Sequence, residues 1–155
     1  MMMRRQTGLL ALLLLVCWLP AQAIITGELI MVRSDKTFPE AMLILQDAIK
    51  TQGYTLSRVQ RVDIGLTMSG YPTDKYRIVF FGKTEQIHEL TKKHPELIPY
   101  LPLKIAIFAE ADETLLVTSD PAIFMDLYPD PRLHEVFHQW HEDIVNIMKK
   151  VQIPD

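Results

Sequence analysis

Near the carboxyl end of the chain, five residues spell a pattern typical of zinc proteases. They are His134-Glu135-Val136-Phe137-His138, an H-E-x-x-H segment. In that pattern two histidines one helical turn apart bind the metal ion, and the glutamate acts as general base. Only 17 residues follow His138, which leaves little chain for a third ligand or for a groove that holds a peptide. The context therefore argues against proteolysis, and we assign no catalytic residue and no organic cofactor.

A metal site without catalysis needs fewer residues. His134, His138 and His141 lie at positions i, i+4 and i+7, so they share one edge of a helix. The first and last are about 10.5 Å apart along the axis, at about 1.5 Å per residue. One ion is therefore better held by an adjacent pair and a ligand from elsewhere, such as His88, His94 or a partner subunit. Imidazoles without thiolates suit a divalent transition metal such as zinc, copper or nickel.

The alternative interpretation is that the same three histidines are boundary residues of an amphipathic helix. The helix is predicted over residues 132–151, and its apolar positions fall on one stripe beside the histidine edge. These positions are Leu133, Val136, Phe137, Trp140, Ile144, Ile147, Met148 and Val151. In this interpretation the rings are half packed beneath a sheet or at a subunit contact.

The elements before this helix alternate between strands and helices. Residues 24–33 are predicted as a strand, and a helix follows that begins with a capping box of Thr37 and Glu40 and stops at Gly53. Residues 54–62 form a strand whose alternation slips between Leu56 and Val59, as at a bulge. Residues 63–75 contain two glycines and a proline and are expected to form a loop or a short irregular helix.

The second half of the chain continues with a buried strand, YRIVFF, at residues 76–81 and a helix over 84–94. Pro99 and Pro102 are expected to keep the next stretch extended. Alternation over residues 103–110 and 114–118 then predicts an antiparallel hairpin. Asp120-Pro121 and Asp130-Pro131 each pair an N-cap acceptor with a proline, so two helices should start there. The order predicts an α+β fold in which helices pack on one face of a mostly antiparallel sheet.

Length and charge limit the classes of function. The chain has 155 residues, which is the size of one domain. Of its 16 Lys and Arg, two lie within residues 1–23, so 14 remain against 19 Asp and Glu, a net charge of −5 for residues 24–155. An acidic domain without basic runs argues against electrostatic binding of nucleic acid.

The amino terminus predicts export. Arg4 and Arg5 precede an apolar run of 11 residues, Leu9 to Leu19, which is shorter than the roughly 20 residues that span a bilayer. Pro20 ends the run, and Ala21-Gln22-Ala23 provides a cleavage site. We therefore expect a signal peptide at 1–23, a single α+β domain at 24–155 in the periplasm or secreted, and no stable membrane span after cleavage. The one cysteine, Cys17, lies in the signal peptide, so the domain has no thiol.

Several anchors, in order, resemble a known family. They are Gly53-Tyr54, the YRIVFFG segment at 76–82, Leu101-Pro102-Leu103-Lys104-Ile105 and Asp120-Pro121. Over residues 31–121 the chain resembles the bacterial domain of unknown function family 302. The resemblance implies a small sandwich similar to the TATA-binding-protein-like architecture, often dimeric, and implies no activity. The helix that carries the histidines lies outside these anchors.

Two hypotheses about function follow from the sequence. The first is an exported, non-enzymatic domain that binds a protein partner or a small ligand, with a homodimer as the expected assembly. The second is a periplasmic metal-binding protein that uses the helix histidines. Whether the chain is an enzyme is not decided by any motif, although the balance of the motifs is against it.

Overall fold

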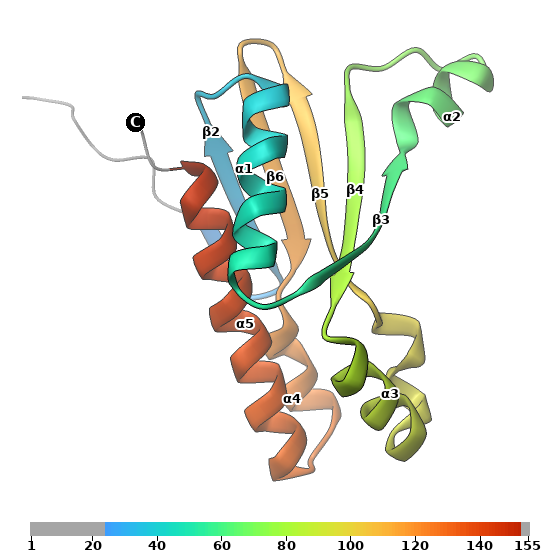
Figure 1. The fold of residues 1–155 in the computed structure, drawn as a ribbon, viewed down its shortest axis with the longest axis vertical. Coiled ribbons are helices and arrows are strands. Elements are labelled where there is room, and N and C mark those ends of the chain that lie inside the picture. Colours follow the sequence, from blue (N-terminus) through green and yellow to red (C-terminus); the bar gives the residue numbers. More distant parts are fainter. Residues whose placement is uncertain (1–23, 153–155) are drawn as a thin grey trace, which may run out of the picture.

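The computed structural model describes residues 24–152, and the predicted signal peptide lies outside the described residues. The described chain forms a six-stranded sheet in the order β1-β2-β6-β5-β4-β3 (Figure 1). Every neighbouring pair of strands is antiparallel. The strands are β1 (Ile24–Thr26), β2 (Leu29–Ser34), β3 (Thr55–Arg61), β4 (Tyr76–Gly82), β5 (Leu103–Glu110) and β6 (Glu113–Ser119). The predicted α+β class is confirmed.

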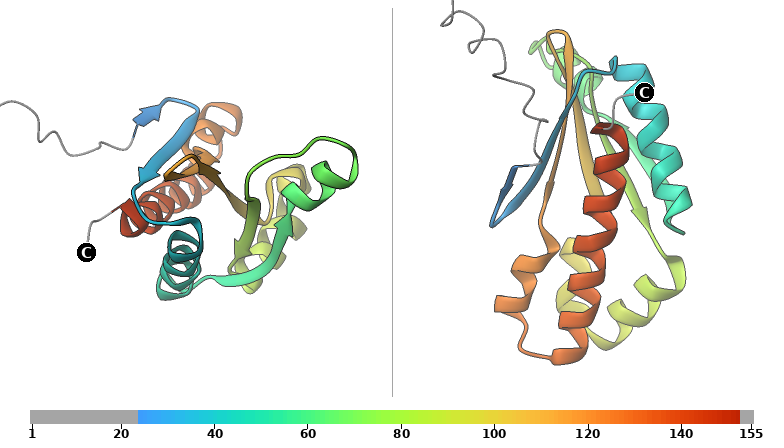
Figure 2. Two further views of the ribbon diagram at one scale, coloured as in Figure 1. Left: turned by 90° about the horizontal axis from the view of Figure 1, so that it is seen from above. Right: turned by 90° about the vertical axis from the view of Figure 1, so that its left-hand side faces the viewer.

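Two long helices, α1 (Phe38–Thr51) and α5 (Pro131–Gln152), pack side by side on one face of the sheet (Figure 2). At the end where β4 and β6 finish lie α3 (Thr84–Lys93) and the short elements η1 (Pro95–Tyr100), η2 (Pro121–Ile123) and α4 (Phe124–Leu127). A small helix, α2 (Val62–Met68), connects β3 to β4 at the opposite end. No helix of the described chain is long and apolar enough to cross a membrane.

The long helices form where the sequence predicts them. The backbone N–H of Thr37 donates to Glu40 Oε2 over 3.0 Å, which satisfies a free donor at the start of α1. Gly53 adopts a φ of 78°, which suits glycine and ends the helix. On α5 the predicted apolar stripe is buried, except that Val136 is half-buried. These helices and the facing sheet residues make one hydrophobic core.

The bulge and the hairpin are confirmed as well. The pairing of β3 with β4 shifts between Leu56 and Arg58. Strands β5 and β6 pair as a hairpin from Glu110 and Glu113 down to Ala106 and Val117. Residues 103–110 alternate so that Leu103, Ile105 and Ile107 are buried.

Two local predictions are wrong. Residues 24–33 form a hairpin rather than one strand, because the chain turns at Gly27 and Glu28 and lets β1 pair with β2. Residues 95–100 form a 3-10 helix rather than an extended stretch. Pro95 occupies the first turn, where a missing N–H costs nothing, and the Leu97 N–H donates to the His94 carbonyl over 3.0 Å. Burial of Leu97 in the core holds this turn in place.

Candidate functional site

The three histidines predicted to bind metal lie on one edge of α5, but their rings have different surroundings. His134 is half-buried, and its Nε2 lies 2.7 Å from the carbonyl oxygen of Tyr128. His141 is also half-buried, and its Nδ1 lies 2.7 Å from Asp120 Oδ1. His138 is exposed to solvent. Two of the three rings therefore fasten α5 to the segment that precedes it.

Asp120 has two roles at this junction. The residue is 3% exposed, and its Oδ1 accepts the N–H of Ala122 over 2.9 Å, which caps η2. The same oxygen meets the ring of His141. The sequence indicates the cap, because an aspartate before a proline is a local signal. It gives no signal for the contact with His141, because that residue is 21 positions away and is brought close only by the packing of α5.

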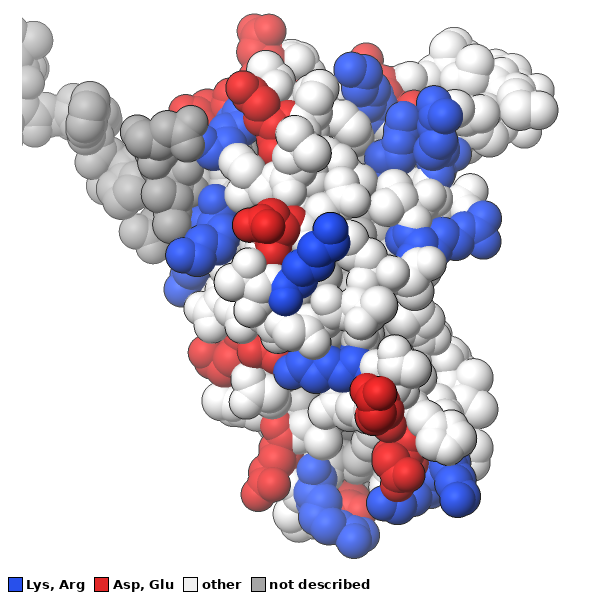
Figure 3. Space-filling model, viewed as in Figure 1, with Lys and Arg blue, Asp and Glu red and all other residues white. Residues whose placement is uncertain are grey.

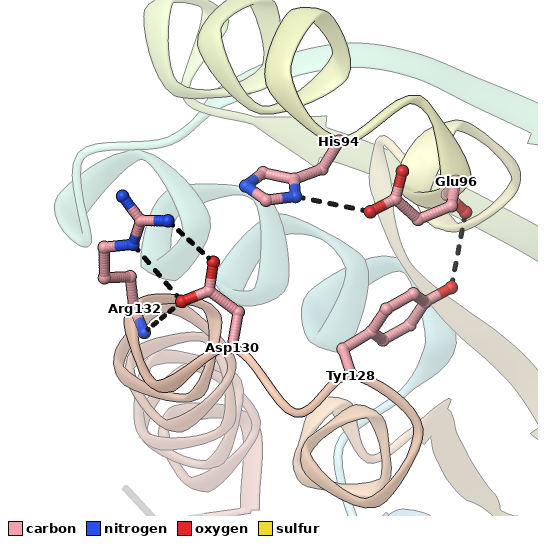
Figure 4. A network of polar contacts seen from close by, with 5 residues as sticks. All are labelled: His94, Glu96, Tyr128, Asp130 and Arg132. Carbon is pink, nitrogen blue, oxygen red and sulfur yellow. Dashed lines mark hydrogen bonds and ion pairs between the residues drawn. The ribbon is translucent and has the colours of Figure 1, made fainter.

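The other two histidines do not join the α5 edge. His88 lies on α3 and is exposed. His94 lies 3.3 Å from Glu96, in a polar network that joins η1 to the turn before α5 (Figure 4). Among residues 24–152 no group of three or more His, Cys, Asp and Glu is placed to hold a metal ion. The metal hypothesis therefore stays a prediction.

The polar contacts in Figure 4 connect η1 with the segment that follows α4. Tyr128 donates its hydroxyl to the carbonyl oxygen of Glu96, and Asp130 accepts from Arg132 through both carboxylate oxygens. The hydrogen bond from Arg132 lowers the pKa of Asp130. Asp130 Oδ1 also accepts the backbone N–H of Arg132 over 3.0 Å, as the predicted N-cap of α5 requires.

A pocket lies close to this junction, between η1, the ends of β5 and β6, η2 and α5. Its volume is about 70 Å³. Tyr100, Phe124 and Ile144 supply apolar walls, and Lys104 and Thr118 supply polar groups. Binding sites for drug-sized ligands usually measure ~300–1,000 Å³. The pocket is therefore too small to enclose an organic ligand of that size.

The face of the sheet opposite α1 and α5 is the larger apolar feature. No helix of the described chain crosses it, as the side view in Figure 2 shows. Strand pairing arranges its side chains in rows: Leu115 of β6, Phe108 of β5 and Tyr76 of β4 are in register. The next row contains Met31, Val117, Ala106 and Ile78. Phe80 of β4 follows. All eight side chains are half-buried. We call these eight residues the open sheet face.

The open sheet face corrects the prediction of a buried strand at 76–81, because only one face of that strand is buried. A continuous apolar run is typical of strands that are covered on both faces. In β4 Val79 and Phe81 are buried in the core, whereas Ile78 and Phe80 point to the other side and stay half-buried. The sequence does indicate two apolar faces, because apolar residues occupy both the odd and the even positions of this strand. What the sequence does not indicate is that one of the two faces has no cover within the described chain.

Fold and surface together define a two-layer α+β domain, with two helices on one side of an antiparallel sheet and an apolar face on the other. The chain belongs to the family of the domain of unknown function DUF302, whose family model matches residues 30–151. The match extends past the anchors recognised in the sequence, which end at residue 121, and includes the histidine-bearing helix α5. Its histidine edge is therefore part of the family domain.

One solved structure supports the same fold. It is the crystal structure of an uncharacterized conserved DUF302 protein from Bacillus stearothermophilus, which superposes with a TM-score of 0.72 at 15% sequence identity. The match covers 80% of this chain and 98% of that chain. No curated protein matches the sequence.

Proposed function

We propose that this chain is an exported, non-enzymatic domain that pairs with a second copy of itself through the open sheet face. The observation that carries the proposal is the set of half-buried apolar side chains on the face without helices. A contiguous apolar surface of this kind is typical of a protein–protein contact. The pocket beside η1 has a volume of about 70 Å³ and would not enclose a drug-sized organic ligand.

The pattern along β5 favours a second copy as the partner. Lys104, Ala106, Phe108 and Glu110 alternate with the buried residues of this strand and therefore share the outer face. A two-fold axis across the strand at Ile107 would place each Lys104 opposite the partner's Glu110 and each Ala106 opposite the partner's Phe108. A small residue would then face a large one, and opposite charges would meet at both ends.

The charges at the rim suit this arrangement. Arg33 of β2 donates to Glu110 and lies 3.4 Å from Glu113. This cluster contains one positive and two negative groups, so it keeps a net negative charge for a lysine of the other copy. At about 3.3 Å per residue, Lys104 and Glu110 are about 20 Å apart. One ion pair would therefore lie beyond the row of Phe108, and the other in the row of Phe80, which is in register with Lys104.

The dimer is tested by replacing Val117, in the middle of the open sheet face, with lysine. Residues 24–155 should be dimeric by sedimentation equilibrium, and Val117→Lys should be monomeric at the same concentration, because an unpaired charge in an apolar interface is costly. The matched control is Leu43→Lys, since Leu43 is 69% exposed on α1, on the helical side. The control should stay dimeric. Circular dichroism should show that both variants remain folded.

A charge exchange tests the orientation of the two copies. Lys104→Glu and Glu110→Lys should each weaken the dimer, and the double variant should recover much of the loss. A wild type that stays monomeric over a roughly 100-fold range of concentration, or a dimer that is indifferent to Val117→Lys, contradicts the proposal.

Export is supported by the predicted signal peptide. The chain recovered from a host that exports it should begin at Ile24, because Ala21-Gln22-Ala23 precedes that residue. Intact-mass measurement decides the result. A mass that still includes residues 1–23 would falsify the predicted cleavage. The dimer proposal would stand independently, since it depends only on residues 24–152.

A further inference from the structure

The segment that joins β3 to β4 extends beyond the end of the sheet (Figure 1). It includes the end of β3, the helix α2 and the start of β4, and we call residues 58–77 the arm. Helix α2 has seven residues and none of them is buried. Isolated helices of this length are unstable in water. An ion pair between Asp63 of α2 and Arg77 of β4 fixes the base of the helix.

The end of the arm is apolar and exposed. Residues 64–73 contain no charged side chain. Ile64 and Leu66 are 38% and 37% exposed, and Met68 and Tyr71 are 84% and 70% exposed. Figure 3 shows this end as an uncharged surface at the upper right of the view. The apolar side chains are thus presented to solvent at the far end of the arm.

The base of the arm is basic, although the chain as a whole is acidic. Arg58, Arg61 and Lys75 are exposed, and Arg77 is paired with Asp63. With Asp74 as the other acidic residue, residues 58–77 contain four basic and two acidic groups, a net charge of +2, whereas the whole chain has −3. Figure 3 shows Lys and Arg beneath the uncharged end.

We propose that the arm inserts its apolar end into the surface of an anionic phospholipid bilayer. Ile64, Leu66 and Met68 would enter the boundary between headgroups and acyl chains, where apolar area is removed from water. Tyr71 suits the headgroup level, because its ring is apolar and its hydroxyl is polar. Arg58, Arg61 and Lys75 would remain among the headgroups, where each basic residue adds attraction to anionic lipid.

The distribution of charge on the arm favours an anionic bilayer over a second copy of the chain as its binding partner. The remainder of the protein is acidic, but the uncharged end of the arm offers it no ion pair, and the basic residues stand behind that end rather than beside it. When the apolar end is inserted in an anionic bilayer, the basic residues behind it reach the level of the headgroups. The short helix would also gain, in the bilayer surface, the apolar environment that the protein itself does not give it.

The experiment uses residues 24–155 and vesicles of phosphatidylcholine with about 30% phosphatidylglycerol, compared with phosphatidylcholine alone. In flotation the protein should bind the anionic vesicles, and binding should fall when the salt is raised from about 0.1 to about 0.5 M. Met68→Asp should abolish binding, and the matched control Leu43→Asp on α1 should keep it. Arg61→Ala and Lys75→Ala should each weaken binding about fivefold, whereas Lys92→Ala on α3, at the other end of the sheet, should not.

A spectroscopic readout locates the insertion. Trp140 is 2% exposed, so a change in the emission of a Met68→Trp variant should report the new side chain, and the emission should shift to the blue with anionic vesicles only. Brominated lipids should quench it. The proposal is overturned if neither vesicle binds the protein, if both bind it equally, or if Met68→Asp binds as well as the wild type. It is also overturned if the emission of the Met68→Trp variant stays unchanged while binding occurs.

Discussion

Replacing Ile107 with alanine is expected to lower the free energy of unfolding by about 2–5 kcal/mol. Ile107 is fully buried in β5, between β4 and β6, with Arg77 and Leu116 as its partners in register. The shorter side chain loses free energy of burial and leaves a cavity that the surrounding β-sheet and helices close only in part. Denaturation by urea, followed by circular dichroism, measures the change.

Two comparisons make this result specific. Ile105→Ala should have a similar effect, because Ile105 is also fully buried and points to the same face. Leu43→Ala on α1 should change the free energy of unfolding by no more than about 0.5 kcal/mol, since that side chain is largely exposed. If both isoleucine variants unfolded at the wild-type urea concentration, the assignment of the core face of β5 would be wrong.

The alternation that identifies Ile105 and Ile107 shows which parts of the fold can be predicted from the sequence alone. A period of two is a local signal and predicts the core face of β5 correctly, as helical spacing predicts the apolar stripe of α5. The capping box of α1 and the bulge of β3 are also local signals, and the structure confirms both. The order of strands in the sheet has no such signal. It depends on pairing between strands that are distant in the chain, such as β2 with β6, and no local pattern specifies it.

The sequence predicts the candidate site less well than the fold, for the same reason. The histidine edge of α5 follows from helical spacing and is present, but the partners of its rings, Tyr128 and Asp120, come from another segment. The rows of the open sheet face can be recognised only when the register of four strands is known. The apolar residues of the segment 76–81, interrupted only by Arg77, indicate burial on both sides. Only the arrangement of layers shows which side lacks a cover.

The second large change in the free energy of unfolding is expected from mutation of a buried polar cluster. Asp143 of α5 is 6% exposed and accepts the hydroxyl of Tyr54 over 2.7 Å and the amide of Gln139 over 2.9 Å. Lys83 Nζ lies 3.5 Å from the same carboxylate and 4.5 Å from the centre of the Tyr54 ring. The cluster connects α5 with the residues that follow α1 and β4.

Asp143→Ala is expected to lower the free energy of unfolding by about 1–3 kcal/mol, because it leaves the buried hydroxyl of Tyr54 without its acceptor. Asp143→Asn should cost less, since the amide oxygen can still accept one hydrogen bond. Tyr54→Phe should cost about 1 kcal/mol, the usual net value of one such bond. Chemical denaturation of the three variants at neutral pH measures this order. An alanine variant as stable as the wild type would show that the cluster contributes nothing.

The same cluster predicts that stability depends on pH, and a comparison of wild type with Tyr54→Phe measures the part that is due to Tyr54. Burial, together with the hydrogen bond to Asp143, raises the pKa of Tyr54 above its usual value near 10. The folded protein therefore keeps the proton while the unfolded chain loses it, so stability is complete below pH ~10 and is lost as the pH rises above that value. The wild type is about 1 kcal/mol more stable than Tyr54→Phe near neutral pH, and this advantage should fall above pH ~10 by up to about 1.4 kcal/mol per pH unit, so that its sign reverses by about pH 11. The other tyrosines are present in both proteins and cancel in this comparison. A difference that stays constant between pH ~9 and ~11.5 would mean that Tyr54 ionises in the folded protein as readily as in the unfolded chain.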